Sequence, residues 1–259
     1  MTAPAAGARV LLDTRTMLDR NLRNSLRSPD ALIMTIAVPV LILLMFVYVL
    51  GGAIEVGGGT YVDYVVPGIL LLCAGFGSAT TAVSVCTDVT EGFVDRFRTM
   101  AVARSAFLNA HVAESLLRNL FTTALVTVLA VLIGFRPTAD PLRWLAALGL
   151  VALFVLALSW ISAALGLLTR SVEAANGSTF AFLFLPYVSS AFVPVESMPG
   201  WLRPVAEHQP VTPVIETVRG LLIGTPIGSS AVLAVSWCAL FIVVGYLGAL
   251  AAFRARTRD

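Results

Sequence analysis

The sequence has no lysine: all 17 basic residues in its 259 positions are arginine. A nucleotide-binding P-loop of the pattern GxxxxGK[ST] needs a lysine that reaches the phosphates. The chain is therefore not itself a P-loop ATPase. If it uses ATP, another protein has to bind the nucleotide and its magnesium.

Histidine and cysteine are equally scarce. The two histidines, His111 and His208, lie far apart, and the zinc-protease pattern HExxH is absent. The three cysteines, Cys73, Cys86 and Cys238, lie in or beside apolar stretches without metal-type spacing. We expect buried free thiols, no bound cofactor or metal and no catalytic residues, which leaves an integral membrane enzyme as a remote alternative.

Charge is also low, since only 12% of residues are charged, against about 25% in soluble proteins. Hydrophobic residues make up 58% of the chain, and its mean hydropathy is +0.90. This composition predicts an all-α, polytopic membrane protein with a single transmembrane domain over residues 1–259.

Apolar runs long enough to cross a bilayer of about 30 Å recur along the chain. The second is rich in glycine, alanine and serine, so we expect it to pack against protein rather than lipid. A proline, Pro186, predicts that the fifth is kinked or short. Six transmembrane helices are predicted, at residues 31–52, 64–87, 108–135, 144–169, 177–195 and 229–253.

Two amphipathic segments interrupt or precede the spans. Residues 9–28 combine a leucine stripe with an arginine-rich face, which predicts an N-terminal interfacial helix held by anionic headgroups. Residues 88–107 place Phe93 and Phe97 on one helical face and Glu91, Asp95 and Arg98 on the other. The second segment is predicted to lie on the membrane surface, either as a docking helix for a soluble partner or as an ordinary loop helix.

A proline-punctuated block, residues 199–224, is too short to span twice. Thr212 and Pro213 read as the N-cap and first residue of a helix that Gly224 can close. We expect external re-entrant or interfacial helices here.

Arginine placement predicts the topology. With the N-terminus inside, 13 arginines face the cytoplasm and four, Arg136, Arg143, Arg203 and Arg219, face outward. The positive-inside rule thus predicts that both termini are cytoplasmic.

Few charges fall inside or beside the spans. Glu114 and Arg118 can pair at i,i+4 and snorkel to the interface, or they can serve a function in the membrane. Glu216 and Arg219 form either a local ion pair or a contact at an external gate. Apolar, aromatic and hydroxyl side chains suit a hydrophobic or amphiphilic cargo better than an ion, and candidates for its pathway are Phe76, Thr80, Phe184, Tyr187 and Ser190.

Two segments carry a family resemblance. One runs from Glu91-Gly92 through Asp95-Arg96-Phe97-Arg98 to Arg104-Ser105-Ala106, and the other from Met198-Pro199 through Gln209-Pro210-Val211-Thr212-Pro213 to Glu216 and Arg219. Together with the order of elements, they resemble the ABC-2 type permeases, in the branch typified by the daunorubicin/doxorubicin resistance permease. Where that branch has Ser-Leu-Pro, this chain has Thr99-Met100-Ala101.

The resemblance implies the permease subunit of an exporter in the bacterial plasma membrane, driven by a separate ATP-binding subunit that carries ATP and Mg. It also implies a second permease copy, identical or paralogous, and no nucleic-acid partner. Export of a polysaccharide or lipid-linked glycan shares this architecture and is the alternative. Residues 88–107 would be the coupling helix, with Glu91, Gly92, Phe93, Asp95, Arg96, Phe97, Arg98 and Arg104 as its contact residues. The external gate would comprise Pro210, Thr212, Pro213, Glu216 and Arg219.

Overall fold

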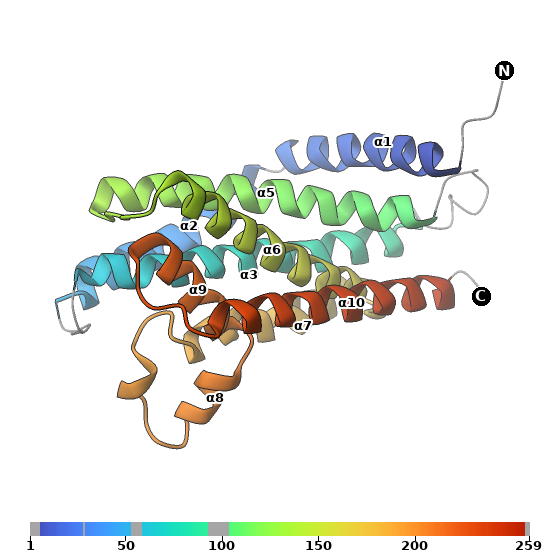
Figure 1. Cartoon of the computed structure of the whole chain (residues 1–259). Coiled ribbons are helices and arrows are strands. Elements are labelled where there is room, and N and C mark those ends of the chain that lie inside the picture. The colour runs from blue at the N-terminus through green and yellow to red at the C-terminus, as the bar shows by residue number, and fades with distance from the viewer. Residues whose placement is uncertain (1–5, 28, 53–58, 93–103, 257–259) are drawn as a thin grey trace.

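The computed structural model describes residues 6–27, 29–52, 59–92 and 104–256. Every regular element in these ranges is a helix (Figure 1). The long elements are α1 (Ala6–Arg27), α2 (Pro29–Leu44), α3 (Tyr61–Thr90), α5 (Arg104–Ile133), α6 (Pro141–Leu168), α7 (Val172–Phe184), α9 (Val211–Ile223) and α10 (Ser230–Arg256). The short ones are η1 (Met45–Leu50, a π-helix), the 3-10 helices η2 (Leu185–Val188) and η3 (Val195–Ser197), and α8 (Arg203–His208).

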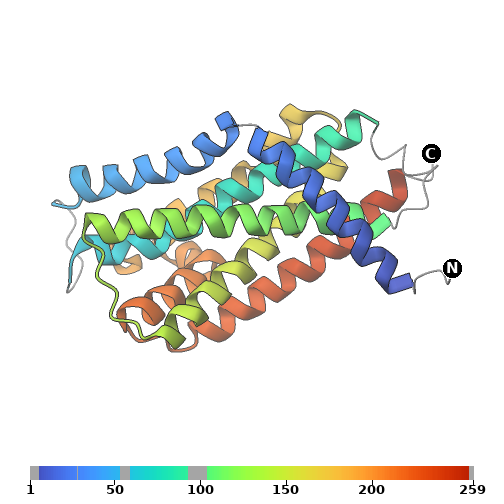
Figure 2. The same ribbon diagram turned by 90° about the horizontal axis from the view of Figure 1, so that it is seen from above.

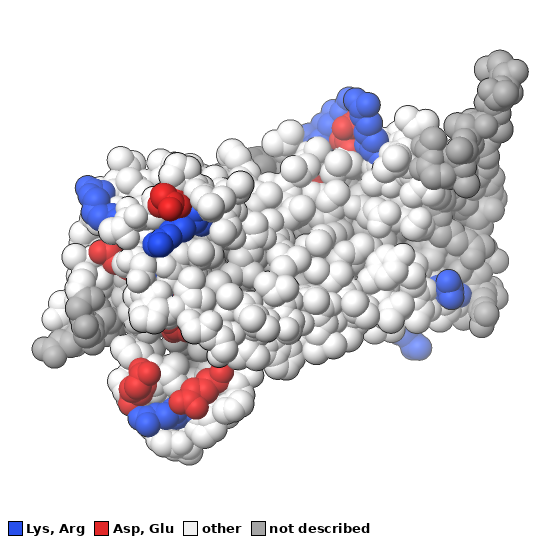
Figure 3. Space-filling view, viewed as in Figure 1, with Lys and Arg blue, Asp and Glu red and all other residues white. Residues whose placement is uncertain are grey.

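Within the described ranges, four helices, α3, α5, α6 and α10, are long and apolar enough to cross a membrane, and they lie side by side (Figure 1). The most apolar window of α3 is 78% buried, whereas that of α10 is 17% buried. Helix α3 is therefore the centre of the bundle, which confirms that its small residues pack against protein. On the face seen in Figure 3, charged side chains gather toward the two ends of the molecule.

The first and fifth predicted spans correspond to shorter helices. The first is divided between α2 and η1, with an apolar stretch at Thr35–Leu50. Helix α7 ends at Phe184, because Pro186 lacks an N–H and disfavours helical backbone in the residue before it. The count of six spans stays a prediction.

Close helix contacts depend on glycine. A Cβ at Gly166 of α6 would overlap the Ala82 carbonyl oxygen of α3, and one at Gly245 of α10 would come within 2.7 Å of the Ile161 backbone nitrogen. These approaches hold α6 between α3 and α10.

Helix α1 crosses α5 obliquely (Figure 2). Its Met17 is buried in a cluster with Phe107 and Phe253, whereas Leu11 and Leu26, each 72% exposed, lie on the outside. The predicted leucine stripe is thus only partly covered by the bundle.

The proline-punctuated block forms α8 and α9, and neither is long enough to span. Gly224 ends α9 with φ +84° and donates its N–H to the Gly220 carbonyl, as expected. The predicted N-cap was wrong: α9 begins at Val211, and the Thr212 hydroxyl donates instead to the Ala206 carbonyl at 2.6 Å.

Arginines fall at both ends of the bundle. The end of α10 and the turn after α6 meet where Arg256 donates to the Thr169 carbonyl, and this end also holds the last turn of α3. At the opposite end, the Thr138 N–H donates to the Leu222 carbonyl, which joins the α5–α6 loop to α9. Which end faces the cytoplasm stays a prediction.

Candidate functional site

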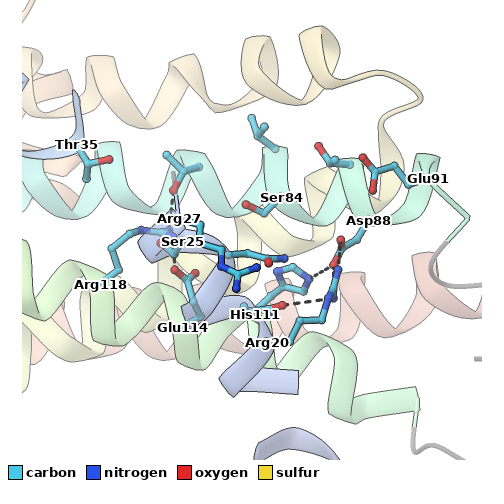
Figure 4. A pocket seen from close by; sticks show the side chains of 15 residues that line it. Arg20, Ser25, Arg27, Thr35, Ser84, Asp88, Glu91, His111, Glu114 and Arg118 are labelled. Atoms are coloured by element: carbon cyan, nitrogen blue, oxygen red, sulfur yellow. Dashed lines mark hydrogen bonds and ion pairs between the residues drawn. The ribbon is translucent and has the colours of Figure 1, made fainter. Parts of the chain in front are cut away.

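A buried carboxylate, Asp88, joins three helices near the end of α3. Its two oxygens accept hydrogen bonds from Arg20 of α1 at 2.8 and 3.1 Å. The His111 Nε2 of α5 lies 3.1 Å from the Asp88 Oδ2 (Figure 4). Because a buried charge is costly without partners, this bidentate pair fixes α1 against α3 and α5. We call Arg20, Asp88 and His111 the Asp88 cluster.

This cluster corrects two sequence-based expectations. Asp88 belongs to the last turn of α3 rather than to a separate surface helix, because α3 continues to Thr90. The sequence places His111 shortly after the predicted surface helix and therefore near headgroups, but the side chain is 4% exposed and faces Asp88. The signal in the sequence for this later helix end is Gly92, because glycine commonly ends helices. In the structure Gly92 has φ +72°, and its N–H donates to the Val89 carbonyl.

The second ion pair, Glu114 with Arg118, lies deeper along α5. The pair forms as predicted, but both side chains are buried instead of snorkelling outward. Arg118 also donates to the Gly77 carbonyl at 3.0 Å and to the Thr80 hydroxyl at 2.6 Å. This guanidinium therefore tethers α5 to α3 in the interior of the bundle.

An open polar pocket of about 460 Å³ lies between α1, α3 and α5 (Figure 4). Both ion pairs form part of its wall. Its lining residues are Arg20, Asn21, Asn24, Ser25, Arg27, Thr35, Thr80, Val83, Ser84, Thr87, Asp88, Glu91, His111, Glu114 and Arg118.

At the opposite end of the bundle, Arg219 of α9 has a guanidinium that is almost fully buried. It donates to Glu216 Oε1 at 2.7 Å, to the Tyr64 carbonyl at 3.1 and 3.2 Å and to the Ser190 carbonyl at 2.7 Å. It also lies 3.8 Å from the centre of the Tyr64 ring, whose hydroxyl donates to the same Ser190 carbonyl. We call Tyr64, Ser190, Glu216 and Arg219 the Arg219 cluster.

The two clusters mark the two ends of α3. Tyr64 and Asp88 are 24 residues apart in one helix, which is about 36 Å. This separation resembles the thickness of a hydrocarbon core, so α3 can present one charged cluster near each membrane surface.

The predicted gate residues share one region but have different contacts. Glu216 and Arg219 form the expected i,i+3 pair. Thr212 and Pro213 are buried in the first turns of α9, and Pro210 is its N-cap residue. The neighbouring Gln209 donates to the Leu185 carbonyl at 3.1 Å, which connects the turn between α8 and α9 to η2. A role in gating stays a prediction.

The residues predicted for the cargo pathway do not share one site. Thr80 contacts Arg118, and Ser190 belongs to the Arg219 cluster. Phe184 and Tyr187, 60% and 42% exposed, continue a row of aromatic rings from Phe180 to Phe192. Phe76 is partly buried in α3.

Most predicted coupling residues lie outside the described ranges: Phe93, Asp95, Arg96, Phe97 and Arg98. The structure describes the two ends of this segment. Glu91 is the exposed C-cap residue of α3, followed by Gly92, and Arg104 begins α5.

Comparison with known proteins adds a family. Residues 13–223 match the family model described as "ABC-2 type transporter". The chain is 31% identical over 221 residues to the "Daunorubicin resistance ABC transporter permease protein DrrB1" of Streptomyces coeruleorubidus, covering 85% of this chain and 78% of the relative. It is 26% identical over 249 residues to the "Probable doxorubicin resistance ABC transporter permease protein DrrC" of Mycobacterium tuberculosis, covering 92% and 88%.

Proposed function

The chain belongs to the ABC-2 type transporter family, and from this we propose that it is the permease subunit of an exporter for hydrophobic or amphiphilic compounds. The family match over residues 13–223 is the observation that carries the proposal. The four long apolar helices in the described part of the chain suit an integral membrane protein. A separate ATP-binding subunit provides the energy, because this chain has no lysine with which to build a P-loop.

Residues 88–107 contain the connection through which this partner would act. Residues 93–103 connect α3 to α5 in the chain, and these two helices are linked by a contact of 3.1 Å between Asp88 Oδ2 and His111 Nε2. A force applied to the segment would therefore reach α3 and α5 together, and α1 through Arg20. This arrangement supports a coupling role for Asp95, Arg96 and Arg98.

The cargo would move along the aromatic row of α7 and η2. Phe180 is 51% exposed, and the ring centroids from Phe180 to Phe184 and from Phe184 to Tyr187 are 6.2 and 6.4 Å apart. A second permease copy facing this row would enclose an apolar, aromatic pathway suited to flat amphiphiles. The relatives' names favour such a drug-like cargo over the glycan alternative.

Assembly with the ATP-binding subunit tests the coupling role. Changing Asp95 and Arg96 together to alanine should weaken co-purification with the ATPase encoded beside this gene at least about tenfold, because charge pairs at interfaces contribute several kcal/mol. The matched control changes Asp140 and Arg143, an exposed pair 4.0 Å apart at the opposite end of the bundle. Equal assembly of both double variants would contradict the coupling role.

A further inference from the structure

The polar pocket between α1, α3 and α5 contains one unpaired charge of each sign. Arg20 is neutralised by Asp88, and Arg118 by Glu114. Within the described ranges, the two remaining charged residues of the wall, Arg27 and Glu91, have no ion-pair partner, and both are exposed. An occupant with a single charge would satisfy only one of them.

The rest of the wall is rich in neutral hydrogen-bonding groups. Ser25, Ser84 and Thr87 contribute hydroxyls, and Asn21 and Asn24 contribute amides. Hydroxyl and amide groups can donate to phosphate oxygens and accept from an ammonium group. The pocket thus offers more polar contacts than a solely apolar ligand would use.

The position of the pocket indicates a membrane ligand. It lies beside the last turn of α3, about 36 Å along that helix from Tyr64 and therefore near a membrane surface. Leu26, 72% exposed, directly precedes Arg27 on α1, so an apolar side chain is available beside the charged one. Amphipathic helices of this kind insert their apolar residues among acyl chains at headgroup depth.

We propose that this pocket binds the headgroup of a zwitterionic aminophospholipid, with the phosphate at Arg27 and the ammonium group at Glu91. Phosphate suits the guanidinium as a bidentate acceptor, and a primary ammonium can donate to the carboxylate. The bound lipid would join α1 to α3 in the pocket that the Asp88 cluster also lines. This site is independent of the cargo and of its pathway.

Lipid titration of the purified, detergent-solubilised chain, followed by native mass spectrometry, tests the site. Phosphatidylethanolamine should bind at least about tenfold more tightly than phosphatidylglycerol or phosphatidylcholine with the same acyl chains, since only it combines the phosphate with a primary amine. Glu91→Gln should remove most of this preference, whereas Arg27→Gln should weaken the binding of all three lipids, because all three carry the phosphate. Arg23→Gln, an exposed arginine of α1 outside this pocket, is the matched control.

Three results would overturn the proposal. If phosphatidylglycerol bound as tightly as phosphatidylethanolamine and Glu91→Gln changed neither affinity, the pocket would be a site for anions alone. Glycerophosphoethanolamine binding as tightly as the lipid would show a soluble ligand instead of a membrane lipid. The same loss in Arg23→Gln as in Arg27→Gln would show nonspecific attraction to α1. Both test positions are exposed, so the variants should fold normally.

Discussion

Arg219→Ala should lower the free energy of unfolding by about 2–4 kcal/mol, because it removes a buried guanidinium that pairs with the partly exposed Glu216 and donates to two backbone carbonyls. The substitution leaves Glu216 without its cation and the carbonyls of Tyr64 and Ser190 without this donor. Denaturant or thermal unfolding in detergent micelles measures the loss. Arg219→Lys should be intermediate, because an ammonium group retains the charge but cannot reproduce the planar fork of contacts.

The matched control for Arg219 is Arg143→Ala at the same end of the bundle. Arg143 is about half exposed and lies 4.0 Å from Asp140, so its removal should change stability by about 0.5 kcal/mol or less. Similar unfolding of the two alanine variants would show that the Arg219 cluster does not hold α9 to α3.

Asp88→Asn should release α1 from the bundle. Asparagine keeps the side-chain shape but has no negative charge, and its single oxygen can accept only one of the two hydrogen bonds from Arg20. The attachment of α1 should lose about 2 kcal/mol. The detached population of α1 should then rise about 30-fold, since each 1.4 kcal/mol is a factor of about ten. The rate of trypsin cleavage after the exposed Arg23 is proportional to this population when α1 detaches and re-attaches faster than trypsin cleaves it.

Asp19→Asn, an exposed carboxylate on α1 itself, is the control and should leave the cleavage rate unchanged. A double-mutant cycle with Arg20→Gln isolates the pair, and its effects should not be additive. Additive effects of the two substitutions, or an unchanged rate of trypsin cleavage in Asp88→Asn, would show that α1 is not attached through Asp88.

The sequence predicts the helical class and most helix positions, because long apolar runs and helix-ending residues act locally. Gly224 ends α9 where its position suggests, and Pro186 shortens α7. The N-terminus of α9 was missed because the Thr212 hydroxyl bonds to Ala206, in the preceding helix, instead of capping its own. Local pattern cannot distinguish these two uses of one hydroxyl.

The polar clusters could be predicted only within single helices. The spacing of Glu216 and Arg219 predicts their pair, whereas Tyr64 is 155 residues away from Arg219 in the chain. Asp88 and Arg20 are likewise 68 residues apart, so no helical wheel could join them. The proposed function rests on the family match, because neither cluster identifies a function by its own geometry.

ATP-driven transport in proteoliposomes tests whether this chain is a permease powered by a separate subunit. The permease and its ATP-binding partner would be reconstituted together, with doxorubicin as the fluorescent probe, chosen because a relative is named for resistance to it. ATP-dependent uptake should require both proteins and should cease when the P-loop lysine of the partner is changed to alanine. Uptake that persists with that inactive partner, or with this chain alone, would show that the separate ATP-binding subunit does not power transport.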